Sequence, residues 1–461
     1  MQNFIKIRIF WVALVIFGLF AVYSTSIWKS FDQRLTVNVM QNIETVKAFN
    51  TFLDETIISS TEKILTKQVP VVSSFVSTGE NWAIEQVDEV QEAALVLPTL
   101  DTLKSEGQEQ VQLVAQGTKS IQLRNNYVLF SSQLKNLIIG LFAMLWVFFL
   151  PLAWFREKKF IFFVAIVVAL LQICVFIPGI AATNGEARGR VDFKVIPNIQ
   201  PAEFFKLGYV FFMSYWLTKR KEFVNSQKFL LQFAMINALV LLVILAIPDF
   251  WTLFILALTG TIMARYLGLK AKKIWMLWGV AIVVAMLGIS FISLVNPKNY
   301  AFSRLTTFLE RDPEARKEIE LREGWQIQQG LVAVGAGGLF GQGYGKGLQK
   351  MGQLPEAYSD MIFAAFSEEI WFFWNLVLFG LYIGLFVSVL GRLSQIRDPQ
   401  MRILAVGIIS LIVVQVFVHV GVNLDILPNT GLTLPFISHW GTALMINLIE
   451  LALLYKILRG K

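Results

Sequence analysis

The segment from Gly324 to Glu369 combines abundant glycine with ionisable side chains, a composition that suits a binding or catalytic loop. Seven glycines fall within the thirteen residues 335–347. Glycine at this density costs backbone entropy, and it suits a chain that turns tightly or lies close to a ligand. Ionisable residues follow and run straight into an apolar segment: Lys350, Glu356, Asp360, Glu368 and Glu369. Charges packed against a membrane span mark a functional site by default, and a structured loop with solvated charges is the alternative.

Further ionisable groups lie within apolar segments or at their ends. Glu203 and Lys206 are three residues apart in QPAEFFKL, so they share one face of a helix and can form an ion pair. Asp249 follows a proline in a break between two short apolar segments, and such breaks are tolerated only inside protein or beside a cavity. Glu450 lies in the last apolar segment, and we interpret it as a buried contact between helices.

The elements that must position these groups are membrane-spanning helices. The chain has 461 residues, 56% of them hydrophobic, and its mean hydropathy is +0.60. The apolar residues form blocks of about 17 to 25, the length that crosses a bilayer core as a helix. A net charge of +8 in such a chain indicates cytoplasmic Lys and Arg rather than nucleic-acid binding. The single cysteine, Cys174, excludes a disulfide framework, and two histidines are too few for a His-rich metal site.

We predict an all-α integral membrane protein with about ten transmembrane helices. The first is residues 9–25, within the N-terminal segment 1–27. A cleaved signal peptide is the alternative there, but no A-x-A site follows. The remaining predicted spans are 133–153, 160–181, 201–218, 229–247, 250–267, 274–295, 361–387, 403–421 and 435–456.

Basic residues recur in alternate links between these spans, as the positive-inside rule requires of cytoplasmic links. The pattern predicts a multi-pass protein of the cell membrane with both termini in the cytoplasm. The residues are Arg156, Lys158 and Lys159; Lys219, Arg220, Lys221 and Lys228; Arg265, Lys270, Lys272 and Lys273; Arg392, Arg397 and Arg402; and Lys456, Arg459 and Lys461.

Two outer regions interrupt the predicted membrane spans. Residues 28–128 are polar, and apolar residues such as Val37, Met40 and Ile43 recur there at helical spacing. They predict a helical extracytoplasmic insertion between the first and second spans, ahead of a polytopic core 129–461. Within that core, residues 296–360 form a large outer loop between the seventh and eighth spans.

A short outer link, Asn184 to Lys194, breaks the charge rule. It carries Arg188, Arg190 and Lys194. Cations at the outer leaflet suggest an anionic partner such as a phosphate, and tolerated surface charge is the alternative.

Four stretches together resemble the SEDS family (shape, elongation, division and sporulation), whose members include FtsW and RodA. The segment 324–369 resembles the family's signature loop, and GVNLDILPNTGLTLPFIS resembles its second signature near the C-terminus. QPAEFFKL is similar to the family's QPSEFAKL motif, and IPDF to its QPD motif. The resemblance covers residues 9–27 and about 127–461. It implies a peptidoglycan glycosyltransferase that polymerises lipid II outside the cytoplasmic membrane, with a class B penicillin-binding protein and other divisome or elongasome membrane proteins as partners.

The resemblance also implies a catalytic aspartate in the large outer loop. Asp312, followed by Pro313, matches that position in RLTTFLERDPEARKEIELREGWQ. Glu310 and Glu314 stay open as alternatives, because the stretch up to Trp325 is longer and more charged than the family pattern. A carboxylate there can take the proton of an attacking sugar hydroxyl as general base.

Cations or a divalent metal would stabilise the departing lipid pyrophosphate. A metal held by Asp312 and substrate phosphates would suit Mg²⁺, with Mn²⁺ as the other candidate. The catalytic and metal-binding candidate is therefore Asp312. The substrate-binding candidates are Arg190, Glu203, Lys206, Arg304, Gln329, Lys350, Glu356 and Asp360.

The sequence departs from the family pattern at three places. The family's paired basic residues followed by Trp stand here as Arg188-Gly189-Arg190-Val191, and its Ser-Tyr-Gly-Gly end stands as Ser438-His439-Trp440-Gly441. The insertion 28–128 is not part of the family core. Its place after the first span would put it beside the outer active site, where a partner could dock, and a spacer without a role in chemistry is the alternative.

Two other functions compete with the glycosyltransferase. A flippase for lipid-linked precursors would also use broken spans and intramembrane charges. A scaffold that activates a partner synthase without catalysing is the third. The outer loop with its carboxylate favours an enzyme, because a transporter needs its charges near the midplane. The sequence Gly431-Leu432-Thr433-Leu434-Pro435 favours the division branch of the family over the elongation branch.

Overall fold

The computed structural model describes residues 7, 9–24, 128–175, 181–184, 187–191, 199–245, 250–295, 325–350, 354–370, 372–429 and 431–460. All of them belong to one of the two units into which the chain divides, Met1–Trp28 together with Tyr127–Lys461. The predicted insertion 28–128, apart from Val128, and the predicted loop residues 296–324 lie outside the described residues.

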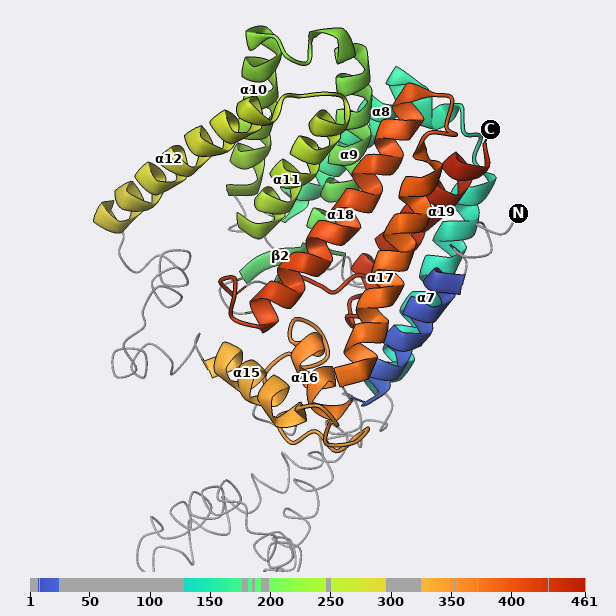
Figure 1. Cartoon of the computed structure of the whole chain (residues 1–461), viewed down its shortest axis with the longest axis vertical. Coiled ribbons are helices and arrows are strands. Elements are labelled where there is room, and N and C mark those ends of the chain that lie inside the picture. Colours follow the sequence, from blue (N-terminus) through green and yellow to red (C-terminus); the bar gives the residue numbers. More distant parts are fainter. Residues whose placement is uncertain are drawn as a thin grey trace, which may run out of the picture. The chain divides into compact units, whose positions relative to one another are not determined.

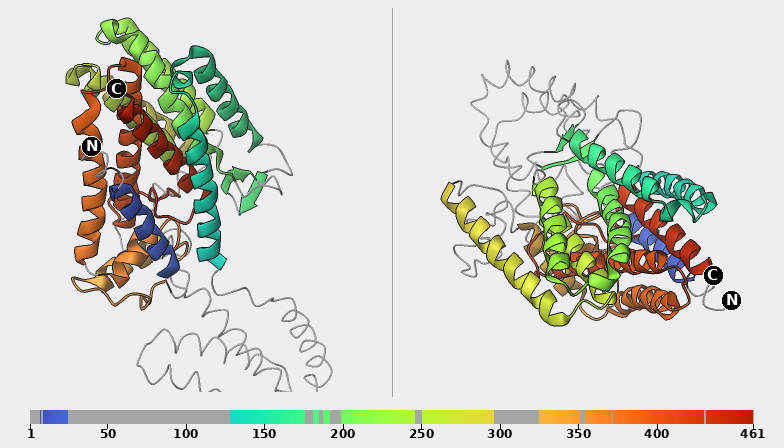
Figure 2. Two further views of the ribbon diagram at one scale, coloured as in Figure 1. Left: turned by 90° about the vertical axis from the view of Figure 1, so that its right-hand side faces the viewer. Right: turned by 90° about the horizontal axis from the view of Figure 1, so that it is seen from above.

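The described residues are mostly helical (Figures 1 and 2). An N-terminal helix, Ile9–Ser24, is drawn in blue. The long helices that follow are α7 (Val128–Phe149), α8 (Lys158–Cys174), α9 (Pro201–Lys219), α10 (Gln227–Leu245), α11 (Phe250–Tyr266), α12 (Ala271–Val295), α17 (Phe372–Leu393), α18 (Pro399–Asn423) and α19 (Gly441–Arg459). Shorter elements are η1 (Trp154–Arg156), η2 (Lys221–Phe223), α15 (Trp325–Gly337), α16 (Ile362–Glu369) and the strands β1 (Ala181–Asn184) and β2 (Ala187–Val191).

Helix α18 lies at the centre of this arrangement, between α11 and α17 in Figure 1. Its sequence is apolar all round, and such a helix is buried rather than amphipathic. Gly407 lets its neighbours approach, because a Cβ there would lie 2.5 Å from a methyl of Val210 on α9 and 2.8 Å from the sulfur of Met263 on α11. Small residues at such crossings are how membrane helices pack closely.

The described helices support a multi-pass membrane protein. Within these residues, four helices have the length and apolar composition to cross a membrane: Phe130–Phe149, Phe372–Leu393, Pro399–Asn423 and Gly441–Arg459. Shorter apolar helices are Ile9–Ser24, Gln227–Leu241 and Trp251–Tyr266. The count of about ten spans and the orientation of the termini stay predictions.

The expectation of an all-α fold was wrong in one place, because β1 and β2 form an antiparallel hairpin. Asn184 pairs with Ala187, so two residues, Gly185 and Glu186, connect the strands in sequence. A two-residue connection that begins with glycine is a hairpin signal. The sequence predicted only a charged outer link from Asn184 to Lys194, because hydropathy and charge do not report strand pairing.

The single span predicted at 361–387 is two helices, α16 and α17. Ile370 between them has an extended backbone (φ −99°, ψ 153°). The carbonyl oxygens of Glu368 and Glu369 accept hydrogen bonds from Gln342 N (2.8 Å) and Gly343 N (3.0 Å). Both donors lie in residues 338–350, which follow α15 and which we call the Gly-rich loop. The loop thus takes carbonyl groups that a continuous helix would have paired internally.

Candidate functional site

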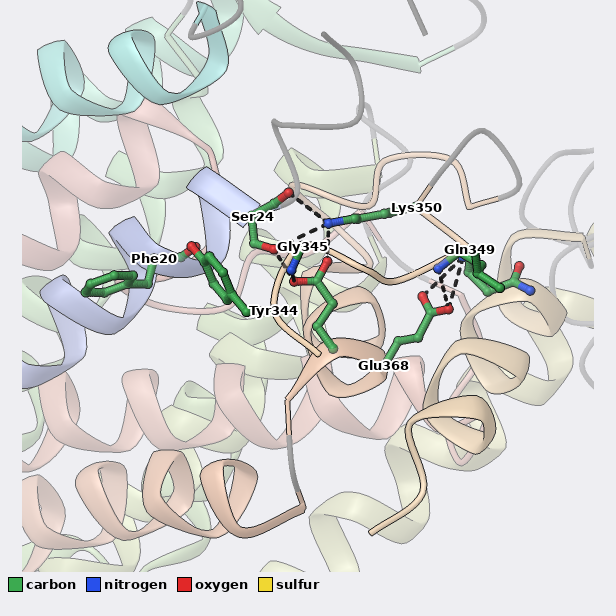
Figure 3. Close-up of polar contacts among 9 residues, drawn as sticks. Phe20, Ser24, Tyr344, Gly345, Gln349, Lys350 and Glu368 are labelled. Carbon is green, nitrogen blue, oxygen red and sulfur yellow. Dashed lines mark hydrogen bonds and ion pairs between the residues drawn. The ribbon is translucent and has the colours of Figure 1, made fainter. Parts of the chain in front are cut away.

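The Gly-rich loop is held by two adjacent carboxylates at the end of α16 (Figure 3). Glu368 Oε1 accepts hydrogen bonds from the backbone N–H groups of Leu348 (2.7 Å) and Gln349 (3.1 Å). Glu369 Oε2 accepts one from Gly345 N (3.0 Å). Both acidic side chains are buried, so these bonds replace the water that the carboxylates lose.

Glu369 also forms an ion pair with Lys350, and both side chains are fully buried. Lys350 Nζ donates to the carbonyl oxygen of Ser24 at 3.0 Å, and the Ser24 hydroxyl donates to Glu369. Ser24 is the last residue of the N-terminal helix. The network therefore joins the C-terminal end of the N-terminal helix to the Gly-rich loop.

Tyr344 strengthens the same junction. Its ring meets that of Phe20 edge to face, with 6.4 Å between centroids. Partial burial, with the Glu369 carboxylate nearby, raises the pKa of Tyr344 to about 12. The phenol therefore stays protonated at neutral pH and donates a 2.9 Å hydrogen bond to the carbonyl oxygen of Phe20.

Gly341 shows why this loop needs glycine. Its φ is +68°, in the left-handed region that side chains with a Cβ rarely adopt. A Cβ there would also lie 2.6 Å from the carbonyl oxygen of Glu369. The predicted tight turns and close backbone approach are both present, although the close neighbour is the protein's own α16.

A second buried polar cluster lies between α9 and α18. Lys206 and Glu203 form the predicted ion pair, with 2.8 Å between Nζ and Oε2. Lys206 also donates to Gln415 Oε1 at 2.8 Å, and Gln415 Nε2 donates to Thr433 Oγ1 at 2.8 Å. Glu450, predicted as a contact between helices, is buried on α19 within electrostatic reach of Glu203 and Lys206. The cluster connects α9, α18 and the segment that precedes α19.

We expect Lys206→Ala to damage both folding and activity. Removing the ammonium leaves the Glu203 carboxylate buried without its partner, which typically costs about 3–5 kcal/mol. The measurement is the yield and melting temperature of the purified variant beside its activity. Lys206→Arg, which keeps the charge, is the companion variant. A well-expressed, fully active Lys206→Ala would show that the pair carries neither role.

A third cluster lies around Asp360. Trp440 Nε1 donates to its Oδ1 at 3.3 Å, and Asn423 Nδ2 donates to its carbonyl oxygen at 3.1 Å. Nearby, Glu356 has a φ of +51°, an uncommon conformation for a residue with a side chain, and accepts a 2.6 Å hydrogen bond from the Ser359 hydroxyl. Such strained positions cluster at functional sites. The hydrogen bond from Asn423 to Asp360 joins the two predicted signature segments, which therefore meet here.

The structure gathers the predicted site residues only in part. Lys350, Glu356 and Asp360 lie in the segment between α15 and α16. Gln329 is half-buried on α15, and Arg190 is a residue of β2 whose backbone pairs with Ala182. Glu203 and Lys206 lie in the separate α9–α18 cluster. Asp312 and Arg304 lie outside the described residues.

No group of three or more metal-ligating side chains occurs among the residues that the structure describes. Two of the buried carboxylates there are already in ion pairs, Glu203 with Lys206 and Glu369 with Lys350. The predicted metal ligand, Asp312, lies outside the described residues.

Sequence reasoning did not select several residues that the structure brings into these networks. Glu368 and Glu369 were noted as charges but were not assigned a site role, although two adjacent acids before an apolar run were a usable signal. Ser24 and Gln415 gave no signal, because a single polar residue at or within a span is common. Their roles depend on partners far away in sequence.

Comparison with known proteins gives a consistent result. Residues 111–461 match the family model described as "Cell cycle protein", which covers FtsW, RodA and SpoVE. The chain is 32% identical over 329 residues to the "Probable peptidoglycan glycosyltransferase FtsW" of Alcanivorax borkumensis, covering 69% of this chain and 81% of that protein. It is 30% identical over 326 residues to "Stage V sporulation protein E" of Bacillus subtilis, covering 70% and 84%.

Solved structures share the fold. A chain of a peptidoglycan synthase complex matches with a TM-score of 0.58 at 22% identity, covering 72% of this chain and 90% of that chain. Thermus thermophilus RodA matches with a TM-score of 0.50 at 21% identity, covering 72% and 88%. At these identities the likeness shows the fold alone, which is a mostly helical membrane fold similar to that of RodA.

Proposed function

Because this chain belongs to the SEDS family of FtsW, RodA and SpoVE, we propose that it polymerises lipid II into glycan strands at the outer face of the cytoplasmic membrane. The observation that carries the proposal is the family match over residues 111–461, with a relative named as a peptidoglycan glycosyltransferase. The geometry supports it, because Glu368 and Glu369 hold the Gly-rich segment, which lies within the predicted outer loop 296–360 and follows Asp312 in sequence.

In this proposal Asp312 is the general base. It takes the proton from an attacking sugar hydroxyl as the new glycosidic bond forms at the anomeric carbon of the other lipid-linked substrate. The bond from that carbon to the lipid pyrophosphate breaks, and the pyrophosphate leaves with the electron pair. Arg190 and Arg304 are the proposed cations at the leaving group. A divalent cation held by Asp312 and the substrate phosphates would add charge stabilisation there.

Lys206 has a different proposed role. Its side chain is 1% exposed and donates to both Glu203 and Gln415. A direct contact with phosphate would require this pair to open. We therefore assign Glu203 and Lys206 to positioning α9 against α18, and we assign Lys350 to holding the Gly-rich loop. The proposed substrate contacts remain Gln329 on α15, and Glu356 and Asp360 in the segment between α15 and α16.

The proposed partner is a class B penicillin-binding protein, within an assembly of other division proteins. Support comes from the structural neighbour, whose synthase complex coordinates polymerization and crosslinking. Septation is proposed rather than elongation, because several relatives are named FtsW.

The test is polymerisation of lipid II by the purified full-length chain, with and without its cognate penicillin-binding protein. We expect glycan strands, resolved by gel electrophoresis, and more of them with the partner. Transfer of a lipid-linked precursor across vesicle membranes is measured in parallel. If the protein transfers the precursor without polymerising it, the flippase is the supported function. If it shows neither activity, the scaffold is the supported function.

A further inference from the structure

Two links on the side that the charge pattern assigns to the cytoplasm lie against each other. They are 219–228, between α9 and α10, and 265–273, between α11 and α12. Asn225 joins them: its Nδ2 donates to Gly268 O at 2.9 Å, and its Oδ1 accepts from Lys270 N at 3.0 Å. Lys273 Nζ donates to the Asn225 carbonyl oxygen. Figure 1 shows both links at the same end of α10 and α11.

This junction carries eight basic side chains and one acidic side chain, Glu222. We call the eight the basic patch: Lys219, Arg220, Lys221, Lys228, Arg265, Lys270, Lys272 and Lys273. Like charges this close repel one another, so the arrangement favours an anionic ligand that neutralises them.

Most side chains of the basic patch have no hydrogen-bond or ion-pair partner among the described residues. Arg220 lies over the Trp216 ring at 4.8 Å and donates to Gln232, and Lys273 donates to Asn225. Apart from Lys219, five side chains of the basic patch are exposed: Lys221, Lys228, Arg265, Lys270 and Lys272. Among the described residues, none of these five side chains has a hydrogen-bond or ion-pair partner.

Three other cations on the same predicted side are engaged by the protein itself. Arg156 pairs with Asp398 at 3.1 Å, Arg402 Nε donates to Ile396 O at 3.0 Å, and Lys456 donates to Phe148 O at 2.8 Å. The positive-inside rule accounts for all of these positions equally. The concentration of unpartnered cations at the junction of the two links is a separate feature.

Apolar side chains border the basic patch. Phe223 is 65% exposed and Trp275 is 76% exposed, and Tyr266 and Met276 are also exposed. Exposed aliphatic residues continue along α12 through Val280, Ile282, Val283 and Met286. Aromatic residues between apolar surface and charge are typical of the level at which a helix leaves the membrane. A soluble polyanion would meet the cations but would gain nothing from this apolar border.

We propose that the basic patch binds the headgroup of an anionic phospholipid, such as phosphatidylglycerol or cardiolipin, whose acyl chains lie against Trp275 and the exposed face of α12. The ammonium groups match the charge of the phosphodiester, and clusters of four or more basic residues beside a membrane helix are a known basis of lipid selection. The hydrogen bonds of Asn225 hold the two links in register, so the site does not depend on the lipid to assemble.

The test is native mass spectrometry of the detergent-solubilised full-length chain with added phosphatidylglycerol, cardiolipin or phosphatidylcholine. The variant is Lys221→Gln, Lys228→Gln, Lys270→Gln and Lys272→Gln combined. The control removes four exposed cations elsewhere on the same side: Lys158→Gln, Lys159→Gln, Arg397→Gln and Arg459→Gln. Both variants lose the same charge, and retained elution volume and melting temperature verify their folding.

We expect the basic-patch variant to bind the anionic lipids about tenfold or more weakly, since each basic residue near a lipid surface contributes measurably. The control variant should keep the wild-type affinity, and Trp275→Ala should lower lipid binding without affecting binding of polyglutamate. Equal losses in the two quadruple variants, or none, would overturn the proposal. If the basic-patch variant loses binding of polyglutamate but binds lipid as the wild type does, the surface would instead be assigned to binding an acidic protein segment. Binding is read without lipid II, so the result is independent of the glycosyltransferase assay.

Discussion

Asp312→Ala is expected to lower lipid II polymerisation by about 10²- to 10⁴-fold, the usual contribution of a general base. Asp312→Asn should fail nearly as badly, because an amide keeps the shape of the side chain but cannot accept the proton. Membrane insertion and partner binding should be unchanged. The measurement is the initial rate of polymerisation, with the amount of purified protein and its co-purification with the partner recorded for each variant.

The neighbouring acids serve as matched controls for Asp312. Glu310→Ala and Glu314→Ala remove a carboxylate from the same loop at a distance of two residues and should keep most of the activity. A normal Asp312→Ala with an inactive Glu314→Ala would move the catalytic role to Glu314. If all three variants polymerise normally, no carboxylate of this stretch is the base.

Lys350→Met is expected to destabilise the protein by about 3–5 kcal/mol, because it leaves the Glu369 carboxylate buried without its cation. The Ser24 carbonyl oxygen would lose its donor as well. Glu369→Gln should destabilise in the same way by leaving the Lys350 ammonium unpaired. The double variant should recover much of the loss, since replacing both charges removes the uncompensated one. The free energy of unfolding is measured in a detergent titration.

Lys346→Met is the matched control for Lys350→Met. Lys346 lies four residues earlier in the same loop, and its side chain is exposed. A surface substitution of this kind usually changes stability by less than about 0.5 kcal/mol. If Lys350→Met and Lys346→Met are equally stable, the buried pair does not hold the Gly-rich loop. Loss of polymerisation by Lys350→Met with unchanged stability would instead point to a direct role in catalysis.

The sequence by itself determined the class of the protein and the family. Hydropathy identifies membrane spans because one apolar block of sufficient length is enough to cross a bilayer. The Glu203–Lys206 pair was also predictable, because residues three apart on a helix are neighbours whatever the rest of the chain does. The Gly-rich loop was also predictable from the sequence, because the need for glycine is a property of the local backbone.

Only the tertiary structure decided which groups meet at the loop. Ser24 and Glu369 are 345 residues apart, and no local pattern could pair them. The predicted span 361–387 is broken because Gln342 and Gly343 donate hydrogen bonds to the carbonyl oxygens of Glu368 and Glu369, and a hydropathy window does not include such distant donors. The same applies to the basic patch, whose two links are joined through Asn225. Local periodicity depends on the backbone of one segment, whereas these contacts depend on how separate helices pack, so only the folded chain specifies them.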